Sequence, residues 1–252
     1  MRQSKKILFT SSKRRDLTVA HLPSGMSIVI ASDSIGSIGQ KPNDMLACPA
    51  ETVGAMAARV ALLEVICSGA VPVSLHNVVA NEMHPTASRM IEGIKGELGQ
   101  ARLGDIDING STEENFDTSM SAVGVTVVGI AQTACLRFGK SYPGDMVVIA
   151  GKPLVGAEVL DDTAGAKASY GDAQTLLDCS EVREIVPVGS KGIAYEAQVL
   201  ANLNGLACEL CDVDGIDFGK SGGPATCLIA SISAKGASEL QKYPVIGTFS
   251  AL

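Results

Sequence analysis

The clearest helical pattern in the chain covers residues 49–67. Apolar side chains recur there at the three- and four-residue spacing of one helix face, at Val53, Met56, Ala57, Val60 and Cys67. Pro49 suits the first helical position, and Glu51 suits the positive end of the helix. Because Leu62 makes the opposite side apolar too, we expect this helix to be buried.

Glu64 lies on the same face of that helix, four residues after Val60. Its carboxylate is therefore expected to be buried with the helix. An ionised carboxylate removed from water is costly unless it has a charged partner or coordinates a metal. The sequence leaves both interpretations open: an ion pair with an arginine or lysine, or a metal ligand.

The other elements follow from the same two periodicities. Strands are predicted over residues 27–31, 71–80, 106–109, 122–131, 146–150 and 225–233, and helices over 85–98 and 192–203. Asp33 is expected at the tip of the first of these strands, above a loop rich in backbone amides, and residues 110–116 are expected to form an acidic turn. A turn at residues 142–145 predicts two domains, residues 1–142 and 143–252.

Composition restricts the kinds of partner that the protein is expected to bind. The 252 residues are 46% hydrophobic and carry a net charge of -7, without the basic stripe that a nucleic-acid phosphate backbone requires. The uncharged run over residues 119–136 contains Gly124 and Gly129 and alternates like a buried strand, so it is not read as a membrane span. We expect neither a nucleic acid nor a membrane as partner.

The start of the chain is basic. Positive side chains stand at Arg2, Lys5, Lys6, Lys13, Arg14 and Arg15, and the apolar residues 7–9 are too few for a signal peptide. A solvated and partly mobile leader is the expected structure. The seven cysteines are an odd number in a chain without a secretory signal, which predicts free thiols and a cytoplasmic location. Cys208 and Cys211 form a C-x-x-C, but two further zinc ligands are missing.

Three segments suggest chemistry: residues 32–36, 63–72 and 109–116. Each places a carboxylate beside a glycine or turn residue at the end of an apolar stretch. Carboxylates that hold magnesium against phosphate oxygens are what phosphoryl transfer from ATP requires, so the hypothesis is a magnesium-dependent ATP user. The site is not a P-loop, because Asp214 stands where the first P-loop glycine would precede Gly219-Lys220-Ser221.

Taken in order, the three segments resemble the superfamily of aminoimidazole ribonucleotide synthase, thiamine-monophosphate kinase, selenophosphate synthetase and a hydrogenase maturation factor. Residues 32–36 are similar to the Asp-Gly-Val-Gly-type segment of that superfamily. Glu64 occupies the place of the aspartate in its Asp-x-x-x-x-Gly-Ala-x-Pro motif, and residues 110–114 look like its Gly-Gly-Glu/Asp-Thr turn. Residues 143–148 match the start of its second domain, and residues 188–193 faintly match its Asp-x-x-Gly-Gly-Leu turn.

The resemblance implies an α+β fold whose first domain forms a β-barrel in a homodimer, flanked by helices, and whose second domain is an α/β sandwich. It implies ATP and magnesium as cofactors, bound at or beside the dimer interface. The implied metal ligands are Asp33, Glu64 and Glu114, and the implied nucleotide contacts are Ser34, Gly36, Lys41, Thr112 and Glu113. The chain departs from the family pattern at Ile38, Leu63 and Ser111, with Lys41 as a substitute for the lysine that Ile38 replaces.

Among the members, the short α-ribazole kinases match best, at residues 36–42 and 109–116. These relatives phosphorylate a benzimidazole riboside in cobamide salvage. A selenophosphate synthetase needs a reactive cysteine near its start, whereas the first cysteine here is Cys48. The hydrogenase factor carries a C-terminal cysteine where this chain has Leu252. No segment before Asp33 has the Gly-Asp-Asp form of thiamine-monophosphate kinase.

Under this hypothesis a riboside hydroxyl attacks the γ-phosphate in line, and positioning supplies most of the acceleration. No general base is identifiable, although Asp44 and Glu82 are candidates, and Phe116 is a candidate stacking surface for the acceptor. The alternatives are another member of the superfamily, such as a thiamine-monophosphate kinase-like enzyme or an amide-activating synthetase, and a catalytically degenerate nucleotide-binding dimer.

Overall fold

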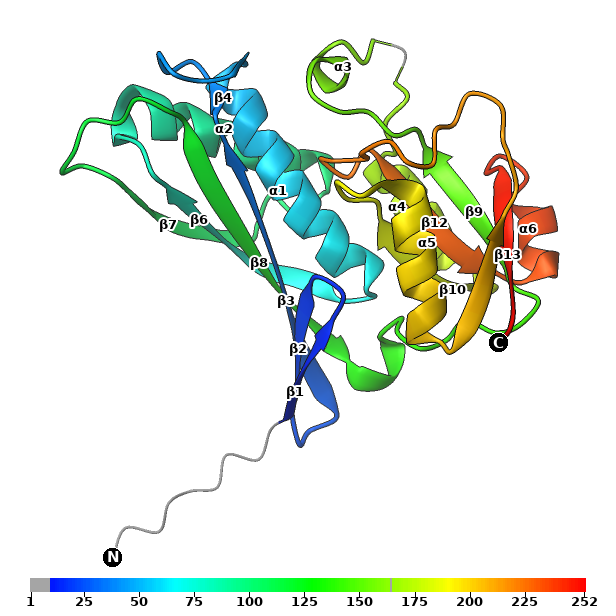
Figure 1. The fold of residues 1–252 in the computed structure, drawn as a ribbon. Helices are drawn as coiled ribbons and strands as arrows, with labels where there is room; N and C mark the ends of the chain where they lie inside the picture. The colour runs from blue at the N-terminus through cyan, green and yellow to red at the C-terminus, as the bar shows by residue number, and fades with distance from the viewer. Residues whose placement is uncertain (1–9, 164) are drawn as a thin grey trace, which may run out of the picture.

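The computed structural model describes residues 10–163 and 165–252, so Arg2, Lys5 and Lys6 lie outside the described residues. The protein has a mixed α/β fold built on two β-sheets, one from each half of the chain (Figure 1). No helix of the described part is both long enough and apolar enough to cross a membrane.

The first sheet has the strand order β1-β2-β3-β8-β6-β7 and is antiparallel except between β6 and β7. Its strands are β1 (Thr10–Arg14), β2 (Leu17–His21), β3 (Met26–Gly36), β6 (Val71–Val79), β7 (Asp107–Thr112) and β8 (Ala122–Gln132). A short parallel pair, β4 (Ile38–Gly39) and β5 (Leu46–Ala47), follows β3. Within the described residues this sheet is open, so the barrel expected from the sequence is not closed by one chain.

Two helices cover one face of the first sheet: α1 (Ala50–Cys67) and α2 (Ser88–Gln100). Pro49 is the N-cap of α1. Gly54 and Gly93 let the two helices approach closely, since a Cβ at either position would stand 2.0 Å or less from a carbonyl oxygen of the other helix. A single π-helical turn, Met83–Ala87, precedes α2.

The opposite face of this sheet carries exposed apolar side chains. Val71, Val73, Val78 and Ile130 are between 38% and 62% exposed. Val71 lies directly opposite Ile130 in the β6–β8 ladder, so their side chains share this face. Since α1 and α2 both lie on the other face, we refer to this surface as the outer face of the sheet.

The second sheet has the order β10-β12-β9-β13-β11, with antiparallel neighbours throughout. Its strands are β9 (Met146–Gly151), β10 (Val182–Pro187), β11 (Leu206–Leu210), β12 (Cys227–Ile232) and β13 (Val245–Ala251). The accompanying helices are α3 (Ala157–Leu160), α4 (Tyr170–Asp178), α5 (Gly192–Leu203) and α6 (Ala234–Glu239), with a 3-10 turn at Thr133–Cys135 between the halves.

Helix α1 lies between the two halves and belongs to the cores of both (Figure 1). Ala61 and Leu62 pack in the core of the first half, whereas Leu63 and Cys67 pack in the core of the second. The helix is therefore apolar all round, as its sequence predicts. The division at residues 142 and 143 stays a prediction.

The structure confirms the predicted α1 and α5 and the predicted strands, with shifts at the ends. Two expectations are wrong. Asp33 is not at a strand tip, because β3 continues to Gly36 and Asp33 pairs with Val125. The acidic turn begins later than expected, because β7 pairs with β6 as far as Thr112. Both β3 and β7 extend beyond their apolar runs because each remains paired with a neighbouring strand there.

Candidate functional site

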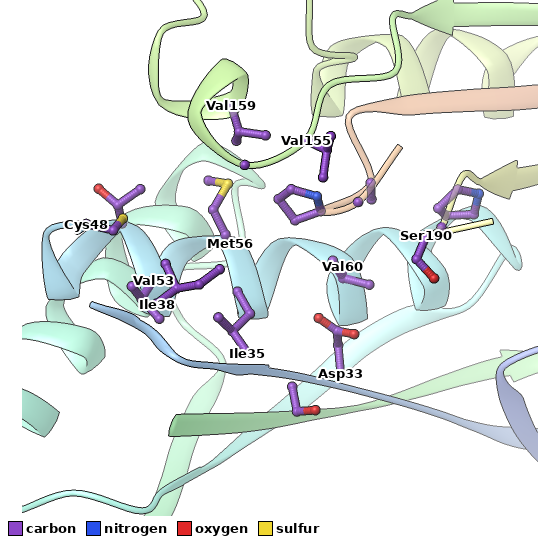
Figure 2. A pocket seen from close by; sticks show the side chains of 18 of the residues that line it. Asp33, Ile35, Ile38, Cys48, Val53, Met56, Val60, Val155, Val159 and Ser190 are labelled. Atoms are coloured by element: carbon purple, nitrogen blue, oxygen red, sulfur yellow. The ribbon is translucent and has the colours of Figure 1, made fainter. Parts of the chain in front are cut away.

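A cavity of about 430 Å³ lies between the two halves of the molecule (Figure 2). One wall is formed by β3 and α1, and the other by three segments of the second half: residues 155–160, which include α3, and residues 187–190 and 223–225. Most of its lining is apolar and comes from Ile35, Ile38, Val53, Met56, Val60, Val155, Val159 and Leu160. A cavity with apolar walls and a few polar groups is the usual form of a small-molecule site.

Asp33 brings a carboxylate into this cavity from β3. Because side chains alternate along a strand, Asp33 shares the inner face of the sheet with Ala31 and Ile35. Figure 2 shows the carboxylate directed toward α1, near Val60. Loss of water raises the pKa of Asp33 to about 6, against the effect of a hydrogen bond from the Ser34 backbone. The group is ionised at pH 7 but close to its titration range.

Glu64 lines the same end of the cavity and forms an ion pair with Arg15. The Arg15 Nη2 atom donates to the Glu64 Oε2 atom at 2.8 Å, and the two side chains are only 6% and 8% exposed. Burial raises the pKa of Glu64, although the Arg15 guanidinium acts in the opposite direction. Of the two interpretations of Glu64, the structure thus contains the ion pair. The expectation that Arg15 belongs to a solvated leader is wrong.

Glu196 is a further acid near this end of the cavity. It lies in α5, is 7% exposed, and its pKa is raised to about 7 because burial outweighs the attraction of Arg15. Asp16, beside Arg15 in the chain, also lines the cavity. Sequence reasoning missed Arg15 and Glu196 as site residues. No local spacing reveals them, since Arg15 is 49 residues from its partner and Glu196 comes from the other half.

Glu114, the third predicted metal ligand, lies elsewhere. Its Oε1 atom accepts hydrogen bonds from the Met83 backbone and from the Thr112 hydroxyl, both at 2.8 Å. It lines a groove of about 610 Å³ whose lining includes Lys41, Glu82, Glu113, Phe116 and Asp117; we refer to this surface as the acidic groove.

The predicted magnesium site does not fit the chain as expected. Asp33 and Glu64 both line the cavity, but Glu114 is in the acidic groove and Glu64 is paired with Arg15. Across residues 10–163 and 165–252 no group of three or more His, Cys, Asp or Glu side chains is arranged to hold a metal ion. Cys208 and Cys211 are free thiols, like the other five cysteines.

The predicted nucleotide contacts are also divided between the two places. Ser34 lines the cavity, whereas Lys41 and Glu113 line the acidic groove, where Lys41 forms an ion pair with Glu82. Thr112 donates to Glu114, and Gly36 is exposed at the end of β3. Two of the three departures from the family pattern have a packing role: Ile38 lines the cavity, and Leu63 is fully buried.

Both predicted candidates for a general base are held by structural hydrogen bonds. Asp44 accepts from the Lys41 backbone and from the backbone and hydroxyl of Ser121. Glu82 accepts from Lys41 and from Thr86. Despite partial loss of water, these hydrogen bonds lower the pKa of both carboxyls, which makes them weak bases. Phe116 is 79% exposed in the acidic groove.

No protein-family model matches the sequence, and no curated protein matches it. Solved structures do match. Thiamine monophosphate kinase from Aquifex aeolicus has a TM-score of 0.69 at 14% identity, covering 95% of this chain and 90% of that one. E. coli HypE, a hydrogenase maturation protein, has a TM-score of 0.65 at 18% identity, with 89% and 80% covered.

The chain has the fold of thiamine monophosphate kinase and HypE. The resemblance stated from the sequence motifs is thereby confirmed at the level of the fold. A third match, tt0281 from Thermus thermophilus, has a TM-score of 0.66 at 15% identity, with 94% and 86% covered. Among the matching structures, one of AaThiL is complexed with AMPPCP and TMP, and one of HypE is in complex with ATP.

Proposed function

We propose that this protein is an ATP-dependent enzyme that transfers a phosphoryl group to the hydroxyl of a small metabolite. The observation that carries the proposal is the cavity between the halves, which presents the carboxylate of Asp33 to an otherwise apolar space. Its fold is shared with proteins whose structures contain ATP or AMPPCP, and this supports ATP as the phosphoryl donor.

Asp33 is the residue best suited to accept the proton of the acceptor hydroxyl. A general base works best when its pKa lies near the working pH, and the pKa of Asp33 is about 6. The hydroxyl proton would pass to the Asp33 carboxylate as the oxygen attacks the γ-phosphate. The family resemblance implied that Asp33 binds a metal. We instead propose that it acts as the base, because Glu64 is paired with Arg15 and Glu114 lies in the acidic groove.

For the acceptor we propose α-ribazole, the benzimidazole riboside suggested by the sequence resemblance. An aromatic base attached to a sugar suits a cavity that has apolar walls and one acidic end. Magnesium is proposed to bind together with ATP. The proposal does not require a magnesium ion held jointly by Asp33, Glu64 and Glu114. The seven free cysteines suit a reducing compartment, and we place the activity in the cytoplasm.

The test is an ADP-release assay with ATP, magnesium and a panel of acceptors. The panel contains α-ribazole, thiamine monophosphate and an amide substrate, and mass spectrometry identifies the product. We expect turnover that depends on a hydroxyl-bearing acceptor and gives a product heavier by one phosphoryl group. Turnover only with the amide would replace the kinase by an amide-activating synthetase.

A catalytically degenerate nucleotide-binding protein is the second candidate. The observation in its favour is the Arg15–Glu64 pair, which engages one of the three carboxylates that the resemblance assigns to a metal. Calorimetric binding of ATP without turnover on any acceptor would establish this candidate in place of the enzyme.

We further propose a homodimer that buries the outer face of the first sheet. Its support is the row of exposed valines on β6, among them Val78 at 62% exposure. Val78→Lys places a charge on this face and is expected to convert a dimer to a monomer at micromolar concentration, as measured by light scattering. Leu203→Lys, at a half-exposed position of α5, is the matched control and leaves the mass unchanged. A monomeric native protein would refute the proposal.

A further inference from the structure

Arg15 reaches the interior from the tight turn between β1 and β2. Its backbone has φ +52, in the left-handed region that residues other than glycine seldom adopt. Such a conformation persists where the surrounding structure holds it. Here the side chain is only 6% exposed, and the guanidinium meets Glu64 of α1. The hairpin therefore serves to place one positive charge inside the molecule.

This positive charge is surrounded by acids. Glu64 is in direct contact with it, and Asp16 and Glu196 are close enough to raise the pKa of Arg15. The charge of Asp33 contributes to raising the pKa of Glu64. Within the described residues, the Arg15 Nη1 atom is buried and has no hydrogen-bond partner. The Arg15 guanidinium is thus the positive charge within a cluster of acids that come from β3, α1, α5 and the hairpin.

We propose that Arg15 takes the place of a divalent cation at Glu64, so that Glu64 is not a metal ligand in this chain. A guanidinium bound to the chain supplies its positive charge at any magnesium concentration, whereas a bound ion can dissociate. This explains how Glu64 can be buried at the predicted position although Glu114 lies elsewhere and no three ligands are arranged around an ion among the described residues. The inference does not depend on the proposed kinase activity.

Removal of this charge would leave the acidic cluster uncompensated. Arg15→Met keeps a side chain of similar length but leaves Glu64, Asp16, Asp33 and Glu196 without their cation. Oxygen ligands of this kind favour hard divalent ions. These acids are not arranged as a metal site while Arg15 is present, but without the guanidinium their mutual repulsion favours any cation that can replace it. We therefore expect Arg15→Met to bind Mn²⁺ at least ten times more tightly than the native protein.

The experiment measures free Mn²⁺ by electron paramagnetic resonance, without nucleotide or acceptor. Arg14→Met changes the neighbouring exposed arginine and serves as the matched control, with no expected gain. The double variant Arg15→Met with Glu64→Gln is expected to lose the gain. Because nucleotide is absent, a failure of the kinase proposal does not affect this result.

Two outcomes would overturn the inference. The first is an Arg15→Met protein that folds and gains no Mn²⁺ affinity. The second is a native protein that binds Mn²⁺ and loses at least tenfold affinity on Glu64→Gln, which would make Glu64 a ligand. The second measurement does not require Arg15→Met to fold, and the inference predicts that Glu64→Gln leaves the Mn²⁺ affinity unchanged.

Discussion

Asp33→Asn is expected to lower the rate of ADP release with a productive acceptor by about 100-fold or more. The amide keeps the size of the side chain but cannot take up the hydroxyl proton, and loss of a general base typically costs a factor of about 10² to 10⁴. The native rate is expected to rise between pH 5 and pH 7, because the pKa of Asp33 is about 6 and only the ionised form accepts a proton. The measurement is the pH profile of kcat/KM for both proteins.

The stability of Asp33→Asn shows whether a lower rate results from loss of the base or from loss of the folded structure. In the unfolded chain the carboxyl has its ordinary pKa of 3.8, so below that pH it is protonated in both states and burial costs little. The cost of burying the charge grows as the pH rises toward 6. Asp33→Asn is therefore expected to be at least as stable as the native protein at pH 7.5, with no such gain at pH 4, measured by denaturant unfolding.

Asp107→Asn, an exposed position of β7, makes the same chemical change in the same sheet and is the control. It is expected to leave both the rate and the stability unchanged. An Asp33→Asn protein that retains the native rate would remove Asp33 from the mechanism.

Arg59→Met is expected to lower the free energy of unfolding by about 3 to 5 kcal/mol, the usual cost of breaking a buried charge pair. Arg59 is 5% exposed and connects α1 to both halves. It donates to the carbonyl oxygens of Ala168 and Ala225 and lies 3.6 Å from a carboxylate oxygen of Glu97. Without it, Glu97 remains as a buried charge, and the cavity loop around Ala225 loses its attachment to α1.

Arg89→Met is the matched control. Arg89 also pairs with a glutamate, Glu51, but these side chains are 40% and 38% exposed. Surface pairs contribute about 1 kcal/mol or less, so this variant is expected to be nearly neutral. Urea unfolding followed by circular dichroism compares the two. A loss below about 1 kcal/mol for Arg59→Met would show that Arg59 is not a main contact between the halves.

The sequence predicts the elements of this fold well where the pattern is local. Helix α1 is recognisable because its apolar spacing is regular, and the burial of Glu64 follows directly from its place in that spacing. The end of β3 is missed because the apolar run stops at Ala31, whereas the ladder with β8 continues through Asp33 to Gly36. Pairing with a distant strand is not visible in local composition.

The candidate site could be predicted only in part for a related reason. Asp33 and Glu64 are found from motifs, and the structure brings them into one cavity. Arg15 is missed because it belongs to a basic stretch that looks solvated, and only the β1–β2 turn directs it inward. Glu114 stands in a motif segment as clear as the others, but hydrogen bonds to Met83 and Thr112 hold it in the acidic groove.

The position of α1 has a consequence for how the protein melts. Different sides of this single helix complete the apolar interior of the first half and one of the two apolar clusters of the second, so both sheets lose packing once the helix is lost. Thermal denaturation is then a single cooperative event that involves both sheets, even though each has its own strand order. A fragment restricted to the later sheet would expose the apolar surface that Leu63 and Cys67 now cover, and would tend to aggregate.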